Sequence, residues 1–287
     1  MATQVHPTAI VEPGAQLGAD AAVGPYAYVG AQVRLGPGCR LLHHAAVTGR
    51  TTLGAGNTVH PGAVIGGPPQ DLKYTGEDTE LVVGERNTFR ECVTVNLGTA
   101  GGGGRTTIGN DCLLMAYVHV AHDCVLEDRV VLANSVQLAG HIRVEYGAIL
   151  SGLSAAHHFV TIGRLSFIGG MSAVRTDVPP FMLVEGNPAR VRNLNLVGLH
   201  RHKVPDQSIA ALKKVFRLAY RDNLPREQVL DRVETMDIRS VDEVRALIQS
   251  FRATQAGRHG RALEATRTDR NGGGVYRDND GPQPPAR

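Results

Sequence analysis

An aliphatic residue recurs at every sixth position along most of this chain, from Val5 to Val174. The series runs over 5–65 without interruption, returns over 83–95, and continues over 108–174 after a shift of one position. An α-helix repeats every 3.6 residues and a strand every 2, so neither explains a period of six. The pattern predicts a parallel β-helix, an all-β solenoid in which each hexad forms one short strand and one corner.

The same repeat predicts how the solenoid is filled. Three hexads close one coil, so each aliphatic side chain points inward and stacks on its equivalent three hexads away. Adjacent coils are then about 4.8 Å apart. A small residue such as Ala21 or Ala27 often stands two positions earlier and fits the interior beside a corner. The period does not fix the hand of the solenoid, although most parallel crossovers are right-handed.

The charge balance and the absence of long apolar runs limit the partners. The 287 residues carry a formal net charge of +3, of which residues 256–287 supply +2, with six Arg against four acidic residues. A nearly neutral folded part argues against nucleic acid as the partner. No signal sequence and no apolar run of about 18 residues is present, so we expect no stable membrane insertion and a cytoplasmic location.

The four cysteines are expected to be buried, reduced thiols. Cys39, Cys112 and Cys124 fall on the small inward position of the repeat, and Cys92 lies close to it. The sequence contains no Cys-x-x-Cys pair, the spacing that would indicate a zinc site.

The repeats are predicted to span residues 1–190 with two interruptions. The polar, Pro- and Gly-rich stretch 66–81 and the Gly-rich stretch 98–105 should project as surface loops, which in solenoids often carry function. Apolar stripes at helical spacing over 191–255 predict a C-terminal α-helical domain. Residues 256–287 lack periodicity and predict a disordered tail.

A group of imidazoles is predicted on one wall of the solenoid, because positions that differ by 18 stand in one column. His122, Gly140 and His158 stand in one column, and Asp123 and His141 stand in the adjacent one. His119 and His157 lie near these columns.

Such a group can perform acid–base chemistry. His122 is the candidate general base, since an imidazole titrates near neutrality. Asp123 would orient an imidazole and favour its protonated form, and the Gly140 N–H would face a developing oxyanion. Two alternatives stay open. One is a metal site as in hexapeptide-repeat γ-class carbonic anhydrases, whose paired ligands are spaced five apart rather than three. The other is a structural cluster on a scaffold or binding protein.

Five motifs resemble, in order and spacing, those of bacterial UDP-N-acetylglucosamine O-acyltransferases. They are QDLKYTGE at 70–77, HVAHDC at 119–124, LANS at 132–135, LAGH at 138–141 and EGNPARVRNLNLVGL at 185–199. The resemblance implies a left-handed β-helix and a homotrimer with active sites between neighbouring subunits. It also implies transfer of a 3-hydroxyacyl chain from acyl carrier protein to the 3-hydroxyl of UDP-N-acetylglucosamine, the first step of lipid A biosynthesis.

The resemblance implies roles for individual residues. His122 matches the catalytic base, Asp123 its supporting carboxylate and Gly140 the oxyanion donor. Gly170 matches the position that limits acyl-chain depth, where Gly leaves room for a longer chain than Met. The matching substrate-binding positions are Gln70, Asp71, Lys73, His119, His141, His157, His158, Asn195 and Arg201. The resemblance implies no metal and no tightly bound cofactor, the acyl carrier protein thioester being the co-substrate.

Several positions depart from the family's pattern. Asn96-Leu97 replace a His-Arg pair, His158 a Gln, Val197 an acidic residue and His202 an Arg. These changes leave open whether the acceptor is a 3-hydroxyl or a 3-amino sugar. An N-acyltransferase acting on a glucosamine that already bears one acyl chain is a further alternative, but that family typically has an additional N-terminal domain. With the cysteines facing inward, nothing indicates an acyl-enzyme nucleophile, and we expect direct transfer.

Overall fold

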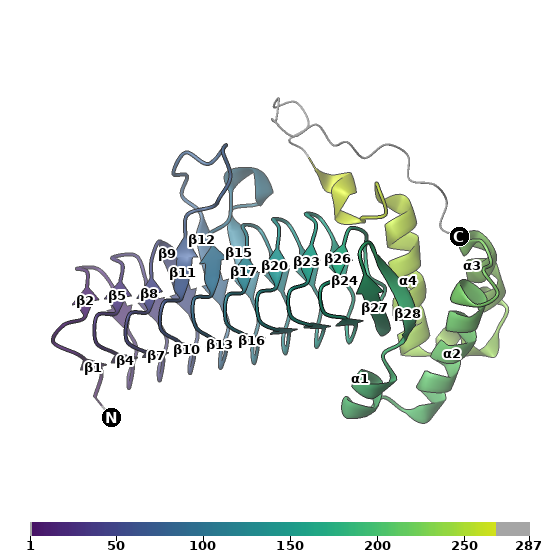
Figure 1. The fold of residues 1–287 in the computed structure, drawn as a ribbon, viewed down its shortest axis with the longest axis horizontal. Helices are drawn as coiled ribbons and strands as arrows, with labels where there is room; N and C mark the ends of the chain where they lie inside the picture. The colour runs from purple at the N-terminus through teal and green to yellow at the C-terminus, as the bar shows by residue number, and fades with distance from the viewer. Residues whose placement is uncertain (1, 268–287) are drawn as a thin grey trace.

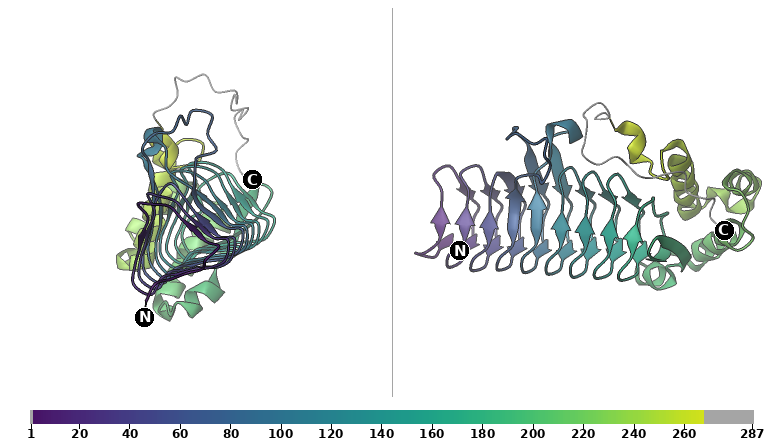
Figure 2. Two further views of the ribbon diagram at one scale, coloured as in Figure 1. Left: turned by 90° about the vertical axis from the view of Figure 1, so that its left-hand side faces the viewer. Right: turned by 45° about the horizontal axis from the view of Figure 1, so that its top comes forward.

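Three sheets, parallel throughout the repeats, dominate the computed structural model, which describes residues 2–267. The sheets contain 11, 9 and 8 strands, and each strand as far as Ala155–Ala156 pairs with the strand three further along the chain (Figures 1 and 2). The chain therefore visits the three sheets in turn. This arrangement fits a hexapeptide-repeat β-helix, as the period of six predicts.

The first sheet contains β1 (Gln4–Val5), β4 (Ala22–Val23), β7 (Arg40–Leu41), β10 (Thr58–Val59), β13 (Thr88–Phe89), β16 (Leu113–Leu114), β19 (Val131–Leu132), β22 (Ile149–Leu150), β25 (Phe167–Ile168), β27 (Met182–Gly186) and β28 (Ala189–Leu194). The second contains β2 (Ile10–Val11), β5 (Tyr28–Val29), β8 (Ala46–Val47), β11 (Val64–Gly67), β14 (Thr94–Asn96), β17 (His119–Val120), β20 (Gln137–Leu138), β23 (Ala155–Ala156) and β26 (Ala173–Val174). The third contains β3 (Gln16–Leu17), β6 (Arg34–Leu35), β9 (Arg50–Leu53), β12 (Glu80–Val83), β15 (Arg105–Ile108), β18 (Val125–Leu126), β21 (Arg143–Val144) and β24 (Thr161–Ile162).

The strand register shows how the two interruptions are accommodated. Ordinary neighbours are three hexads apart, as in Val23 with Leu41, where 41 − 23 = 18. Thr58 pairs with Thr88 across the first interruption, a separation of 88 − 58 = 30, which is 12 more than one coil. Thr88 pairs with Leu113 across the second, a separation of 113 − 88 = 25, which is 7 more. Twelve is two hexads and leaves the phase unchanged, whereas seven shifts it by one position, as the sequence shows.

The core begins one coil into the repeats. Val23 and Leu41 are each 2% exposed, whereas Val5 is 46% exposed although it occupies the same position of the hexad. The first coil has no coil before it in the described residues, so its inward side chains are covered on one side only. Burial in a solenoid requires a neighbour on both sides.

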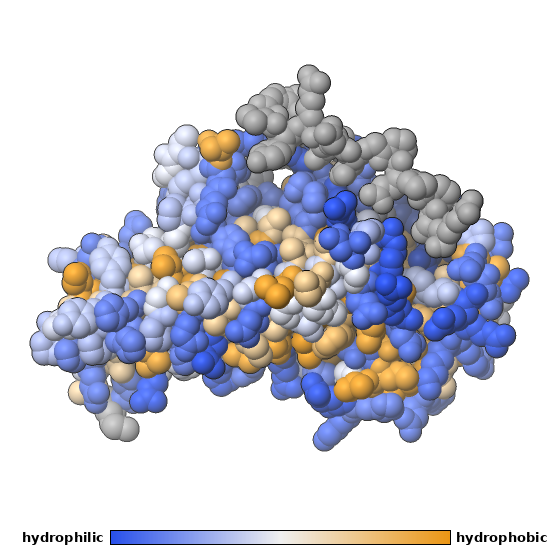
Figure 3. Space-filling view, viewed as in Figure 1, coloured by the Kyte–Doolittle hydropathy of each residue, from blue (hydrophilic) through white to orange (hydrophobic). Residues whose placement is uncertain are grey.

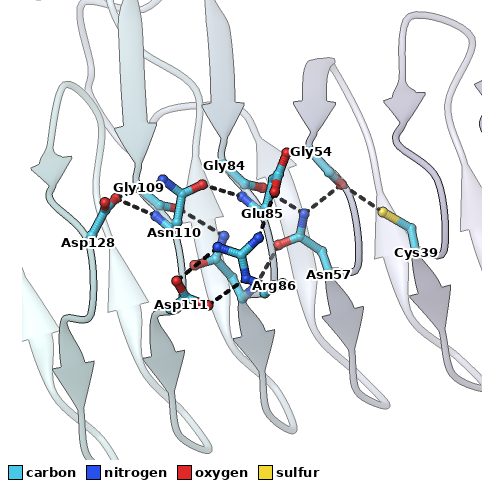
Figure 4. Close-up of polar contacts among 11 residues, drawn as sticks. Cys39, Gly54, Asn57, Gly84, Glu85, Arg86, Gly109, Asn110, Asp111 and Asp128 are labelled. Atoms are coloured by element: carbon cyan, nitrogen blue, oxygen red, sulfur yellow. Dashed lines mark hydrogen bonds and ion pairs between the residues drawn. The ribbon is translucent and has the colours of Figure 1, made fainter.

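Two buried asparagines, Asn57 and Asn87, connect the middle coils. Figure 4 labels Asn57 with its partners Gly54 and Gly84. The Asn57 side-chain amide donates to the carbonyls of Gly54 and Gly84, and its oxygen accepts from the Asn87 N–H at 3.0 Å. Asn87 repeats the arrangement one coil on, donating to the Gly109 carbonyl and accepting from the Cys112 N–H at 2.8 Å. These amides satisfy backbone groups at one corner of the coils that carry the two insertions, and buried backbone groups need such partners.

The repeats lead into an antiparallel pair, β27 and β28, and then into helices. The α-helices are α1 (Leu196–Arg201), α2 (Asp206–Tyr220), α3 (Arg226–Glu234) and α4 (Asp242–Ala256), and the 3₁₀ helices are η1 (Ala100–Gly102), η2 (Asp237–Ser240) and η3 (Leu263–Thr266). The buried Leu212 and Val215 of α2 and Leu247 of α4 belong to the hydrophobic core. No helix among residues 2–267 is long and apolar enough to cross a membrane. Figure 3 shows polar and apolar residues mixed over the face that it presents.

The start of the predicted disordered tail is corrected by the structure. Residues 257–267, named here the C-terminal segment, pack on the end of the repeats, with Arg261 3% and Glu264 2% exposed. Long-range hydrogen bonds to Asp177 hold the segment, and sequence periodicity does not report such contacts. Residues 268–287 lie outside the described part of the chain.

Replacing Asn87 with Ala should destabilise the protein by at least about 2 kcal/mol. The substitution leaves the Gly109 carbonyl and the Cys112 N–H buried without partners, at about 1–3 kcal/mol each. The measurement is the free energy of unfolding by chemical denaturation, with Thr88→Ala, at a half-buried neighbouring position, as the control. Equal stabilities of the two variants would contradict a structural role for the buried amides.

Candidate active site

One corner of the repeats carries three side chains in a vertical column. Asp123, His141 and Phe159 occupy the same corner of three successive coils and all adopt the left-handed backbone conformation, with φ of 59°, 61° and 63°. Asp and His tolerate this conformation better than most residues. The His141 and Phe159 rings stack at 4.4 Å with an interplanar angle of 8°. The corner therefore builds one continuous wall from a carboxylate and two aromatic rings.

His122 and Asp123 form a close pair on this wall. His122 Nδ1 lies 2.7 Å from Asp123 Oδ2. Asp123 is 7% exposed and also accepts from the Thr99 N–H at 2.9 Å and the Thr99 hydroxyl at 2.6 Å. Burial alone would raise the pKa of Asp123, but the hydrogen bonds from His122 and Thr99 outweigh it and hold the pKa below its usual value. A carboxylate only accepts, so His122 carries its proton on Nδ1 and presents the lone pair of Nε2.

Gly140 lies against the His122 ring. A Cβ at position 140 would be 2.5 Å from His122 Cε1 and 2.7 Å from Nε2, so any side chain there would collide with the imidazole. Among residues 2–267 the Gly140 N–H donates to no protein group. Because position 140 is a glycine, His122 Nε2 and the Gly140 N–H can both be reached by a substrate at the same place.

The two projecting loops and the C-terminal segment enclose a pocket over this wall. The pocket is lined by Asp71, Lys73, Tyr74, Glu77, Thr99, Ala100, Gly101, Gly102, His141, Phe159 and Arg267. The second loop approaches Asp123 closely, since a Cβ on Gly102 would overlap the carboxylate. The loop insertions in the repeat thus supply one side of the pocket.

The other predicted histidines surround the pair. His119 Nδ1 lies 2.8 Å from the Thr94 hydroxyl, and burial is the main reason that its pKa lies below the ordinary value, with the charge of His122 contributing. The rings of His157 and His158 are 3.8 Å apart. Burial, helped by His157, lowers the pKa of His158 to about 4. The His158 Nε2 is buried and has no hydrogen-bond partner within the described residues.

Other predicted site residues are not joined to this pocket within residues 2–267. Asn195 caps α1, its oxygen accepting from the Gly198 N–H and its amide donating to the Leu165 carbonyl. Arg201 is exposed in the last turn of α1. Gln70 is exposed beside the first loop, and Gly170 is exposed at a corner beyond His122. Of the departing positions, Asn96 and Leu97 are buried, Val197 is 70% exposed, and His202 packs edge-on against Tyr146.

Thr99, Phe159 and Arg267 are among the residues of the candidate site that the sequence did not single out. Thr99 lies in the second projecting loop, and only its place before the Gly run pointed to a turn. Phe159 lies one coil after His141, so column arithmetic extended by three hexads would have found it. Arg267 lies in a stretch without periodicity, and no sequence signal places it.

The thiols offer no nucleophile near this wall. Cys39, Cys112 and Cys124 are buried as expected, and burial raises the pKa of Cys112 to about 11 and of Cys124 to about 12. The expectation is wrong for Cys92, which is exposed because it occupies a corner with a φ of 57° rather than an inward position.

A metal ion has one candidate position among the described residues. One ligand atom each from His122, Asp123 and His141 lie within 4.8 Å of one another. Two imidazoles and a carboxylate are a donor set that Zn²⁺ accepts.

Two family models match parts of this chain. The family model described as bacterial transferase hexapeptide (six repeats) matches residues 105–140, and the one described as UDP N-acetylglucosamine O-acyltransferase, domain 2, matches 177–260.

Individual relatives carry the same family name. An acyl-[acyl-carrier-protein]–UDP-N-acetylglucosamine O-acyltransferase from Gloeothece citriformis (strain PCC 7424) is 53% identical over 189 residues, covering 66% of this chain and 68% of the relative. The enzyme of that name from Anaeromyxobacter sp. (strain Fw109-5) is 48% identical over 253 residues, covering 88% and 98%. The solved UDP-N-acetylglucosamine O-acyltransferase of Moraxella catarrhalis RH4 superposes with a TM-score of 0.82 at 37% identity, covering 86% of this chain and 96% of that one.

The repeats and the histidine wall define a hexapeptide-repeat transferase. Within that class the chain belongs to the acyl-[acyl-carrier-protein]–UDP-N-acetylglucosamine O-acyltransferase family. The resemblance seen in its five motifs is confirmed, and the protein is an acyltransferase.

His158→Gln should flatten the pH dependence of stability. The folded pKa of about 4 lies below the ordinary 6.5. As the pH falls through this window, the unfolded chain binds a proton that the folded chain does not, and stability is lost. Between pH 7 and pH 5 the free energy of unfolding should therefore fall less in His158→Gln than in the wild type. His6→Gln, at an exposed ring, should fall like the wild type; a His158 variant that did so too would contradict the shifted pKa.

Proposed function

We propose that this protein transfers a 3-hydroxyacyl chain from acyl carrier protein to the 3-hydroxyl of UDP-N-acetylglucosamine, the first step of lipid A biosynthesis. The observation that carries the proposal is the His122–Asp123 pair at 2.7 Å, facing Gly140 beneath a pocket. The names of the relatives support the substrates. The cytoplasmic location stays a prediction.

His122 acts as the general base in this proposal. Its Nε2 removes the proton of the sugar hydroxyl as the oxygen attacks the thioester carbonyl. The C–S bond then breaks, and the imidazolium returns the proton to the sulfur, so that the carrier leaves as a thiol. Asp123 holds the ring by Nδ1 and stabilises the imidazolium that forms, as carboxylates do beside catalytic histidines. The Gly140 N–H donates to the developing oxyanion. The transfer is direct, since the thiols near the wall are buried and protonated.

Gly170 sets the acyl-chain depth in the same proposal. It is exposed, and a Cβ there would lie 3.3 Å from the Gly152 carbonyl oxygen. The same corner carries Leu153 and Met171, which are 64% and 75% exposed and stand one coil apart. Such an apolar edge suits contact with an acyl chain.

A homotrimer of left-handed β-helices completes the site in this proposal. Asn195 and Arg201 are not among the described residues that line the pocket, and a neighbouring subunit would supply them. This accounts for two substrate-binding positions that the single chain leaves apart from the histidine wall.

The second candidate is a metal-dependent reaction, because His122, Asp123 and His141 group as ligands. Against it, Asp123 already accepts two hydrogen bonds from Thr99 as well as the one from His122. We therefore propose that the enzyme uses neither a metal nor another cofactor.

His122→Ala should reduce kcat/KM by roughly 10²–10⁴-fold, the contribution of a general base. The assay is mass spectrometry of the product from UDP-N-acetylglucosamine and a panel of 3-hydroxyacyl carrier proteins. His60→Ala, in a half-buried histidine at another corner, is the matched control and should retain activity. Wild-type activity in His122→Ala would refute the base, and a wild type that forms no product would refute the function.

Exhaustive chelation should leave the transfer rate unchanged, because base catalysis by His122 uses no ion. The measurement is the rate after dialysis against a chelator, with the metal content determined in the same sample. Loss of activity that added zinc restores would favour the metal-dependent alternative.

Mixed oligomers of His122→Ala and Arg201→Ala chains should regain activity well above either parent. If sites lie between subunits, some sites then receive an intact His122 from one chain and an intact Arg201 from its neighbour. Analytical ultracentrifugation should first show a trimer and confirm that mixed trimers form. Verified mixed trimers without recovery would contradict shared sites.

A further inference from the structure

The C-terminal segment is anchored to the repeats through one carboxylate. Asp177 Oδ2 accepts from the Ala262 N–H at 2.7 Å and from the Thr254 hydroxyl at 3.2 Å, while Oδ1 accepts from the Thr161 N–H at 2.8 Å. The Asp177 N–H in turn donates to the Gly260 carbonyl at 2.8 Å. The segment is therefore tied to the corner that follows the last repeats.

A buried ion pair fixes the end of this segment. Arg261 Nε lies 3.1 Å from Glu264 Oε2, with the side chains 4% and 3% exposed, and Arg261 Nη1 donates to the Arg175 carbonyl. Besides Asp123, these two are the buried charged residues among residues 2–267. Burying an ion pair gives little net stability, because desolvation offsets the attraction. A positioning role explains the pair better than a contribution to stability.

The group that the pair positions is the Arg267 guanidinium. Glu264 Oε1 lies 3.3 Å from Arg267 Nη1, and the guanidinium carbon is 5.6 Å from the centre of the Phe159 ring. Phe159 stacks on His141, whose Nε2 is 3.8 Å from Asp123 Oδ2. Arg267 thus reaches the histidine wall by two successive ring contacts and lines the same pocket as Lys73 and His141.

We propose that Arg267 is a substrate-binding residue of the acyl-transfer pocket and that it binds a phosphate group. The proposal rests on the proposed function, whose two substrates both carry phosphate: a diphosphate in the sugar nucleotide, and a phosphodiester on the thiol-bearing arm of the carrier protein. A guanidinium binds phosphate through paired hydrogen bonds.

The surrounding charges shape this site. Lys73 is the second cation that lines the pocket, and the acidic residues Asp71 and Glu77 line it as well. Glu264, which does not line the pocket, forms an ion pair with Arg267. The carboxylates of Asp71 and Glu77 repel a phosphate from their part of the pocket. They would therefore direct the phosphate to the side where Arg267 lies. The family model ends its match at residue 260, so this residue lies beyond the part of the chain that the family model describes.

The test compares Arg267→Ala, Arg267→Lys and Glu264→Gln with the wild type. Arg258→Ala, exposed in the same segment, is the matched control. We expect Arg267→Ala to raise KM by about 10–100-fold for the substrate that supplies the phosphate, the range for a lost hydrogen bond to a charged group. Arg267→Lys should recover only part of this, because an ammonium lacks the paired geometry. Glu264→Gln should raise the same KM by less, and the melting temperature of both Arg267 variants should stay that of the wild type.

The two sources of phosphate are distinguished by separate measurements. KM is determined for UDP-N-acetylglucosamine and for the acyl carrier protein, and calorimetry measures binding of the sugar nucleotide and of the carrier protein without its acyl chain. A change confined to one substrate identifies that substrate as the source. If KM and binding for both substrates are unchanged in Arg267→Ala, the proposal about Arg267 is overturned. The proposed function still stands in that case, provided that the wild type transfers the acyl chain. A wild type without transfer would refute the function, and the calorimetry would still decide whether Arg267 binds phosphate.

Discussion

The backbone hydrogen bonds between coils are the interaction on which this structure depends. Each coil presents its N–H and carbonyl groups to the coils before and after it, so a residue is held one strand spacing from its equivalent three hexads away. The columns of side chains are consequences of that spacing. Asp123, His141 and Phe159 form a wall because three successive coils repeat one corner with one backbone conformation. Side chains that must keep fixed distances are held more precisely by rigid elements such as these repeats than by loops.

The two loop insertions modify this lattice without breaking it. Each insertion leaves from a single corner, and the strands on either side still pair, as Thr58 does with Thr88 and Thr88 with Leu113. The buried amides of Asn57 and Asn87 satisfy the backbone groups at those altered coils. The second insertion then returns Thr99 to Asp123, so one loop both orients the carboxylate and closes one side of the pocket.

The fold and the histidine wall could be predicted because both follow from periodicity. A register of three hexads places His122, Gly140 and Asp123 together before any coordinates are known, and the pairing of His119 with Gln137 agrees with it. The C-terminal segment could not be predicted, since its order comes from single contacts such as the Ala262 N–H with Asp177, 85 positions apart. The exposure of Cys92 could not be predicted for a related reason. An inward position and a corner position are adjacent in the sequence, and a period of six read near an insertion does not tell them apart.

The buried charges show where the fold departs from its own regularity. The repeats bury aliphatic, small and uncharged polar side chains, whereas Asp123, Arg261 and Glu264 are the charged residues buried among residues 2–267. Asp123 lies beside the pocket, where it accepts hydrogen bonds from Thr99, and Arg261 and Glu264 lie in the C-terminal segment, whose Arg267 lines the pocket. Each is compensated: Asp123 by Thr99 and His122, Arg261 and Glu264 by each other and by the Arg175 carbonyl. A solenoid stabilised by aliphatic stacking gains little from such groups. In the proposed function they hold the catalytic and substrate-binding side chains in place, which a core of stacked hydrocarbon cannot do.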